Sequence, residues 1–284
     1  MLPIWRQLLQ HVKHDFSVSS LRAIFSALKR EEFFVMLYKD IEIQDRSLLL
    51  DIVCELVEND DKQQRSALSK QPIIDHQTKL LTDFSLACDS VQFIATTFIS
   101  EIATLLTHLD QTNNVAHLSA SVEDCIRLVV KLTALLLKLT SVESYRSAIQ
   151  TNDDKYVHLS ENSYVLVIIS LFRSALLATS IDLLKKLQVL SKTAEFSSIF
   201  ATRGRLKDVT GSETHESENN PAFGFKRDVV GLIANLIYKH EKAQRMLRET
   251  DGLAALLDCA KIDARNPFIL QVSIFAIRNA LEGN

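Results

Sequence analysis

The chain has eight histidines and four cysteines, the side chains that most often bind metal ions or act as nucleophiles. The cysteines lie far apart, with no CxxC pair and no histidine at ligand spacing beside any of them. His11 and His14 share a helical face, but two ligands without a third are typical of histidines that face solvent or a partner. The spacing therefore predicts no metal site and no activated thiol, and it indicates reduced, buried cysteines.

The glycines are the residues that would build a phosphate-binding loop. All six of them fall outside the patterns GxGxxG and GxxxxGK[ST]. Because nucleotide and dinucleotide chemistry has no visible site in this sequence, we expect no cofactor. We also expect that the protein is not an enzyme.

Two asparagines stand inside helical patterns, where Asn is an unfavourable residue. Asn235 in GLIANL and Asn279 in FAIRNAL lie 44 residues apart (279 − 235). In peptide-binding armadillo arrays such an Asn lines the concave groove and bonds an extended ligand, with a Trp one turn earlier; here those positions are Gly231 and Phe275. Two interpretations stay open, a groove residue or a structural Asn that bonds within or between repeats. The predicted protein-binding residues are Asn235, Lys239, Phe275 and Asn279.

Helical periodicity runs along nearly the whole chain, and no segment alternates as a strand would. The segment 121–140 is apolar on two faces, so other helices should surround it. Asp251-Gly252 predicts a break between two short helices, and Asn266 before Pro267 predicts an N-cap for the last helix. The expected helices lie near 4–14, 18–39, 46–58, 73–109, 119–140, 160–191, 225–240, 242–250, 253–260 and 267–282.

The 44-residue spacing is typical of helical solenoids, whose repeats recur at about 40 residues and bury their apolar faces against one another. We therefore expect an all-α protein, an armadillo/HEAT-like α-solenoid superhelix with a right-handed stack of helices. Residues 1–206 should form N-terminal helical repeats, residues 207–222 an acidic flexible loop or linker, and residues 223–284 a C-terminal repeat unit. The linker is expected because residues 207–220 contain a single aliphatic side chain.

A specific order of motifs runs from Phe225 to Asn279: FK, IANLIYK, a Gln, Asp-Gly, LLDC, Asp-x-x-Asn-Pro-Phe and AIRN. In this order and spacing the segment resembles the C-terminal domain of the ataxin-10 family. Two positions depart from the family pattern, at Ala243-Gln244 and at Leu270-Gln271. The resemblance implies an armadillo-like cytoplasmic scaffold, linked in the family to cytokinesis and to the survival and outgrowth of neurons.

Charge and hydropathy narrow the expected partners. A net charge of −3 and a pI near 6.3 lack the basic excess that a phosphate backbone or an anionic membrane requires, so no nucleic acid is expected. Arg173 interrupts the apolar stretch 164–179, which is shorter than the roughly 20 residues of a membrane span, and the N-terminus shows no secretory signal. The expectation is a cytoplasmic protein without membrane insertion.

Three functional classes fit such a chain. The leading hypothesis is a non-catalytic scaffold whose partners are other proteins, with homo-oligomers left open. The alternative is an importin-like transport adaptor that binds extended peptides. An enzyme on a solenoid framework would require a polar pocket with perturbed ionisable groups.

Overall fold

The computed structural model describes residues 33–68, 88–111, 119–141, 163–192, 199–200 and 220–282. Every regular element in these ranges is an α-helix and none is a strand, which confirms the all-α prediction. The solenoid arrangement stays a prediction. The helix expected near 4–14, Pro72 and residues 207–219 of the acidic segment lie outside the described ranges.

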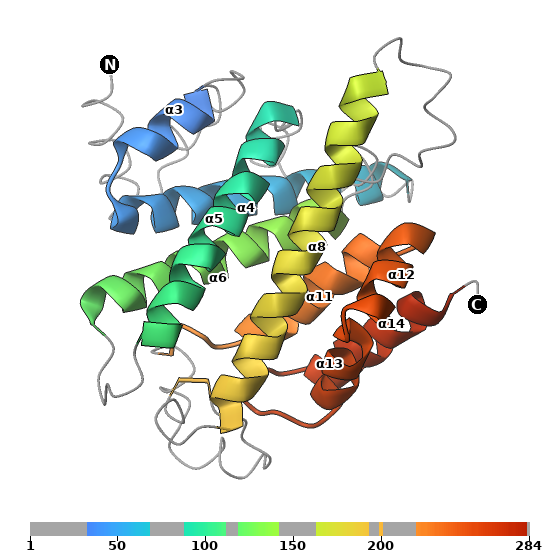
Figure 1. Cartoon of the computed structure of the whole chain (residues 1–284). Helices are drawn as coiled ribbons and strands as arrows, with labels where there is room; N and C mark the ends of the chain where they lie inside the picture. Colours follow the sequence, from blue (N-terminus) through green and yellow to red (C-terminus); the bar gives the residue numbers. More distant parts are fainter. Residues whose placement is uncertain are drawn as a thin grey trace. The chain divides into compact units, whose positions relative to one another are not determined.

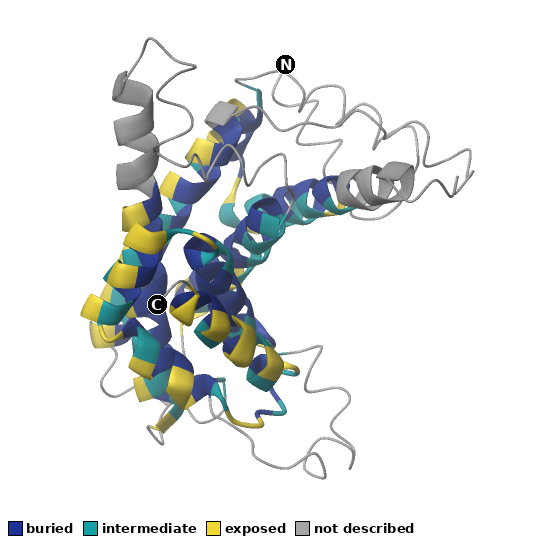
Figure 2. Ribbon diagram, turned by 90° about the vertical axis from the view of Figure 1, so that its right-hand side faces the viewer, coloured by how far each residue is buried: buried dark blue, intermediate teal, exposed yellow. Residues whose placement is uncertain are grey.

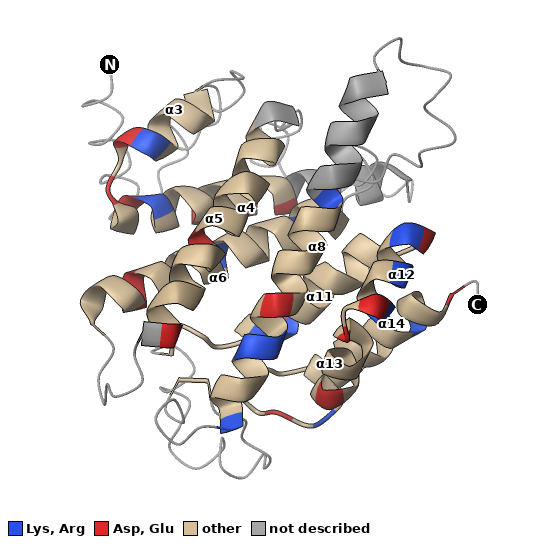
Figure 3. Ribbon diagram, in the orientation of Figure 1, with Lys and Arg blue, Asp and Glu red and all other residues tan. Residues whose placement is uncertain are grey.

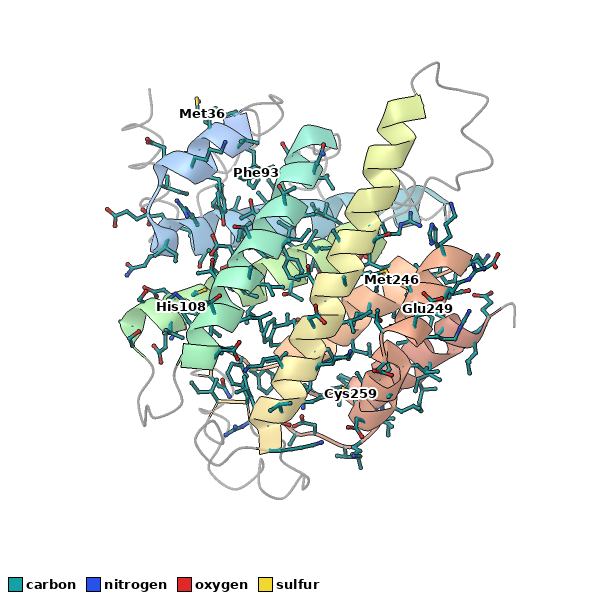
Figure 4. All side chains as sticks on the ribbon, viewed as in Figure 1. Met36, Phe93, His108, Met246, Glu249 and Cys259 are labelled. Carbon is teal, nitrogen blue, oxygen red and sulfur yellow. The ribbon has the colours of Figure 1, made fainter. Side chains whose placement is uncertain are left out.

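The chain forms two compact units, Met1–Thr97 and Phe98–Asn284. The first contains α3 (Phe33–Asp40), α4 (Ile43–Leu68) and the beginning of α5 (Cys88–Gln111). Aromatic rings join α3 to α5: Phe34 and Tyr38 are buried, and the centroid of Phe93 lies 6.1 and 5.4 Å from theirs in edge-on contacts (Figure 4). The α4 helix runs ten residues beyond the expected end at 58, because the polar segment after it is rich in Lys, Gln and Arg, which are good helix formers.

The second unit holds the remaining helices, which Figure 1 shows in green to red. They are α6 (Ala120–Ser141), α8 (Ser163–Lys192), α11 (Phe225–Ile237), α12 (Glu241–Glu249), α13 (Gly252–Cys259) and α14 (Ile269–Leu281). The core lies around α11, which packs against α6, α8 and α14. Every residue of α11 except Arg227 and Asn235 is buried, so its apolar sequence faces protein on all sides.

The burial of α6 confirms the prediction of two apolar faces. Ile126 and Val129 on one face are buried, and so are Leu128 and Leu132 on the other. Figure 2 shows the same tendency across the described helices, with buried positions in dark blue on inner sides and exposed positions in yellow on outer sides. Helices of this kind are stable because the apolar surface is removed from water on every side.

Two polar side chains of α8 fasten it to the C-terminal helices. The Lys185 ammonium donates a hydrogen bond to the Thr250 carbonyl, at the end of α12. Gln188 Nε2 donates to the Ala255 carbonyl of α13 at 2.6 Å. Because a cation at the C-terminal end of a helix is favourable, Lys185 stabilises α12 as well as its contact with α8.

The predicted break at Asp251-Gly252 is confirmed, since α12 ends at Glu249 and α13 begins at Gly252. Asp251 adopts the left-handed conformation with φ 57°. The predicted N-cap of the last helix is wrong: α14 begins at Ile269 after Phe268, and Asn266 is not its cap. The side-chain oxygen of Asn266 instead accepts a hydrogen bond from the Arg227 backbone N–H, in the first turn of α11, at 3.3 Å. The Asn266 side chain thus makes a tertiary contact with α11 and does not cap α14 as the local sequence pattern predicted.

One described helix meets the length and composition of a membrane span, Ser90–Asp110, with a mean hydropathy of 1.3. The interior helix of a soluble protein meets the same condition. In this structure several of its apolar side chains are buried in protein, among them Ile94, Phe98 and Ile102.

Candidate protein-binding site

Asn279, one of the predicted binding residues, lies between α14 and α11. The residue is 2% exposed, and its Nδ2 donates to the Ala234 carbonyl of α11 at 3.1 Å. Its own backbone carbonyl accepts a hydrogen bond from Gln244 Nε2 of α12 at 2.8 Å. Arg248, one turn further along α12, donates to the next carbonyl, that of Ala280, at 2.9 Å. The end of α14 is therefore held on two sides, by α11 and by α12.

Asn235, the equivalent residue of α11, makes the corresponding contact with α6. It is half-buried, and its Nδ2 donates to Thr140 Oγ1 at 3.0 Å and to the Leu137 carbonyl at 3.3 Å. Each asparagine thus donates to a main-chain carbonyl of the preceding helix in the series α6, α11, α14. This geometry matches the structural alternative, in which the amides bond neighbouring helices.

The other two predicted residues lie on the surface. Lys239 is exposed in the turn between α11 and α12, with φ 50° and its Nζ 5.2 Å from the centroid of the Tyr238 ring. Phe275 is 44% exposed on α14, one turn before the buried Asn279. The four predicted residues therefore do not form one site, and their role in binding stays a prediction.

Phe275 belongs to a larger exposed surface on α14, which we call the α14 outer face. Arg278 is the only charged residue within α14, and the helix appears almost entirely tan in Figure 3. Single exposed apolar side chains are ordinary, whereas several along one helix indicate a contact surface. The α14 outer face consists of Phe268, Gln271, Ile274, Phe275, Arg278 and Leu281.

Sequence reasoning missed a buried polar cluster that positions the start of α11. Lys226 Nζ lies 3.3 Å from Asp263 Oδ2, and both side chains are almost fully buried. Asp263 also accepts hydrogen bonds from the Arg265 backbone N–H at 3.1 Å and from Asn266 Nδ2 at 2.9 Å. The cluster explains why Asp-x-x-Asn and Phe-Lys occur together in this segment. The separate motifs were the only sequence signal for it.

A cavity of about 230 Å³ lies in the second unit where α8 meets α13. Lys192 Nζ and Lys261 Nζ are each 3.7 Å from a carboxylate oxygen of Asp258, so both cations have an acidic neighbour. Cys259, labelled in Figure 4, accepts a hydrogen bond from Gln188 Nε2 at 3.3 Å. The cavity is lined by Gln188, Ser191, Lys192, Lys226, Asp258, Cys259, Lys261, Asp263 and Ile269.

The electrostatics of this cavity do not activate its thiol. Burial raises the pKa of Cys259, and the hydrogen bond from Gln188 only partly offsets that effect. A raised pKa keeps the sulfur as the neutral thiol at neutral pH, whereas a nucleophilic cysteine needs a lowered one. The cavity therefore combines paired surface charges with a thiol that stays neutral.

These observations define the class of protein: an all-helical chain in which polar side chains fasten successive helices and the last helix presents an apolar face. Residues 225–284 match the family described as the spinocerebellar ataxia type 10 protein domain. Residues 225–284 are thus similar to the C-terminal domain of the ataxin-10 family, which confirms the resemblance seen in the sequence.

Individual relatives extend the likeness beyond this domain. The Ataxin-10 of Homo sapiens is 34% identical over 131 residues, 46% of this chain and 26% of the human protein. The Ataxin-10 of Xenopus tropicalis is 44% identical over 63 residues, 22% of this chain and 13% of the relative. An Ataxin-10 homolog of Dictyostelium discoideum is 39% identical over 61 residues, 22% of this chain and 10% of the relative. The alignment to the human protein thus spans about a quarter of its length. No solved structure matches the chain.

Proposed function

We propose that the protein is a non-catalytic scaffold that binds other proteins through the α14 outer face. The observation that carries the proposal is the row of large apolar side chains exposed along one helix: Phe268, Ile274, Phe275 and Leu281 are 69%, 57%, 44% and 51% exposed. Water contact with such a surface is unfavourable, and covering it with a partner releases free energy in proportion to the apolar area removed from water.

The match of residues 225–284 to the ataxin-10 family domain supports a more specific role. We propose that the protein acts in the cytoplasm, in cytokinesis and in the survival or outgrowth of neurons, as the family resemblance implies. The paired charges of the cavity and the raised pKa of Cys259 support the non-catalytic part of the proposal.

The importin-like alternative receives no support from the two asparagines. A peptide-binding groove needs amides that point at the ligand, whereas the Nδ2 groups of Asn235 and Asn279 donate to α6 and α11. We therefore retain the scaffold as the proposed function.

Proximity labelling in dividing cells tests the proposal. The wild-type chain would be compared with an Ile274→Ser, Phe275→Ser double variant, whose changes lie on the exposed side of α14 and leave the core intact. A Met36→Ser variant controls for the loss of an exposed apolar side chain in the first unit. We expect the double variant alone to lose labelled partners while its melting temperature stays near that of the wild type. Unchanged labelling by the folded double variant would contradict the proposed surface.

A further inference from the structure

The backbone around Phe268 repeats the backbone at the start of α11. Shifting the numbering by 44 aligns Gly224 with Phe268, and both precede the first helical residue, with φ 75° and 66°. The hydrogen bonds repeat as well: Phe225 N–H donates to the Ala222 carbonyl and Ile269 N–H to the Asn266 carbonyl, at 3.2 and 3.0 Å. The same turn therefore starts both helices.

The two turns differ in the residue that occupies the left-handed position. Glycine has no Cβ and adopts positive φ without strain, so Gly224 suits its place. A bulky side chain in this region is an outlier, since its Cβ crowds the backbone. Strained residues persist where the surrounding structure forces them, and they occur often at functional sites. Phe268 is thus a residue that the turn itself does not favour.

Packing inside the protein does not account for Phe268 either. Its side chain is 69% exposed, the most exposed of the large apolar residues that the structure describes. The neighbouring motif residues Asp263 and Asn266 hold the loop and the start of α11 through their own hydrogen bonds. The aromatic ring is therefore presented to the outside by a turn that buried polar contacts make rigid.

The composition of the α14 outer face indicates what covers it. Two positions of α11 that lie near α14 carry small residues. A Cβ added to Gly231 would lie 3.0 Å from Leu137 Cδ1 of α6 and 3.7 Å from Val272 Cγ1 of α14, and the Ala234 carbonyl accepts from Asn279. The same positions on α14, shifted by 44, are Phe275 and Arg278. Large side chains prevent the close approach that α14 makes to α11, so another layer in this register does not fit.

The positive charge of Arg278 indicates the chemistry of the partner. Arg278 is exposed and makes no hydrogen bond or ion pair with the residues that the structure describes, so its guanidinium can receive a carboxylate. Phe268 and Phe275 are seven residues apart, about 10 Å along the helix at roughly 1.5 Å per residue, the spacing at which one helix meets another. Arg278 follows Phe275 within the next turn.

We infer that the α14 outer face docks an amphipathic helix of another protein, with Phe268 as the anchor and an acidic side chain of that helix on Arg278. The inference rests on the proposed scaffold function and deepens it. A few large aromatic side chains commonly carry most of the binding energy of an interface. The occupant is a helix with apolar residues at helical spacing and one Asp or Glu between them.

Selection from a displayed library of amphipathic helical peptides tests the inference. The full chain would be compared with Phe268→Gly, which places in this turn the residue that α11 has there. We expect the best selected peptide to lose about thirtyfold in affinity on the Phe268→Gly chain. The melting temperature should stay equal or rise, because glycine relieves the strained conformation. Met36→Ala, an exposed apolar residue of the first unit, is the matched control.

A charge exchange makes the test specific for the partner chemistry. Arg278→Glu should weaken the binding of the acidic peptide, and changing the acidic residue of that peptide to Lys should restore its binding to the variant. A library that yields no helix dependent on Phe268, or binding indifferent to the charge exchange, overturns the inference. Self-association of the chain that Phe268→Gly abolishes also overturns it, since the face would then receive a second copy. If labelling in cells requires Ile274 and Phe275 but tolerates Phe268→Gly, the proposed function stands and this inference fails.

Discussion

Asn279 and Phe275 illustrate at the residue scale how two neighbours on one helix take different roles. The asparagine amide is buried and donates to the Ala234 carbonyl, whereas Phe275, one turn earlier, is 44% exposed. Their spacing of four residues places them on one helical face, and the boundary between the buried and the exposed surface of α14 falls between them. The sequence pattern could not locate this boundary, because it depends on the position of α11.

Asn279→Ala should lower the free energy of unfolding by about 1–3 kcal/mol, because it removes the amide donor and leaves the Ala234 carbonyl without that partner in a buried place. Phe275→Ala on the same helix should change stability by less than about 1 kcal/mol, as expected of a partly exposed side chain. Urea denaturation of both variants gives the comparison. A loss for Phe275→Ala as large as that for Asn279→Ala would mean that this ring belongs to the core.

Asp228 gives a residue-scale prediction with a defined dependence on pH. Burial raises the pKa of this carboxyl above its ordinary value of 3.8, while the Arg227 guanidinium, 2.7 Å away, lowers it in part. A raised pKa in the folded state contributes stability at low pH that is lost as the pH rises through that pKa. Asp228→Asn, which stays neutral, should therefore gain stability relative to the wild type near neutral pH.

The advantage of Asp228→Asn should shrink as the carboxyl of the wild type becomes protonated. Denaturant melts of both proteins at about pH 7.5 and about pH 4 measure the difference. An advantage of the same size at both pH values would show that the effect does not arise from titration of Asp228.

At the scale of elements, the junction between α12 and α13 depends on two adjacent residues, Asp251 and Gly252. A Cβ on Gly252 would lie 2.5 Å from Leu247 Cδ1 and 3.0 Å from the Leu247 carbonyl oxygen. Gly252→Ala should therefore force the two helices apart and destabilise the protein by about 1–3 kcal/mol. Asp251, with φ 57°, is the matched neighbour, because Asp251→Gly suits that conformation and should be neutral or stabilising.

Thermal unfolding of these two variants distinguishes steric from conformational causes. A lower melting temperature for Gly252→Ala together with an equal or higher one for Asp251→Gly would show that α13 must approach Leu247 closely. A similar loss at both positions would instead indicate that the side chain of Asp251 has a role that its geometry does not show.

At the scale of the whole molecule, the C-terminal domain depends on helices that precede it in the chain. The buried surface of α11 faces α6 and α8 as well as α14. Residues 220–284 alone would expose most of that surface to water, so this fragment should lack a cooperative melting transition. Residues 98–284, the second compact unit, should melt cooperatively. Circular dichroism of both fragments during heating measures the difference, and a cooperative transition of the shorter one would show that the domain folds alone.

The sequence by itself determined the helical elements of this protein. Apolar periodicity, the Asp251-Gly252 break and the two-faced pattern of α6 are local properties of the chain, and the structure agrees with them. The order of motifs after Phe225 also indicated the similarity of residues 225–284 to the ataxin-10 family domain. Such signals survive without tertiary information because they depend on residues within one or two turns of each other.

Only the tertiary structure decided which partner each polar side chain has and which apolar side chains stay exposed. Asn266 leaves its own helix because the first turn of α11 lies within reach, and Asn235 and Asn279 bond α6 and α11 for the same reason. Phe268 stays outside the core, although Asn266 in the same turn bonds the start of α11. A hydrogen bond or a buried contact depends on distances of a few ångströms between residues far apart in sequence, and periodicity carries no information about those distances.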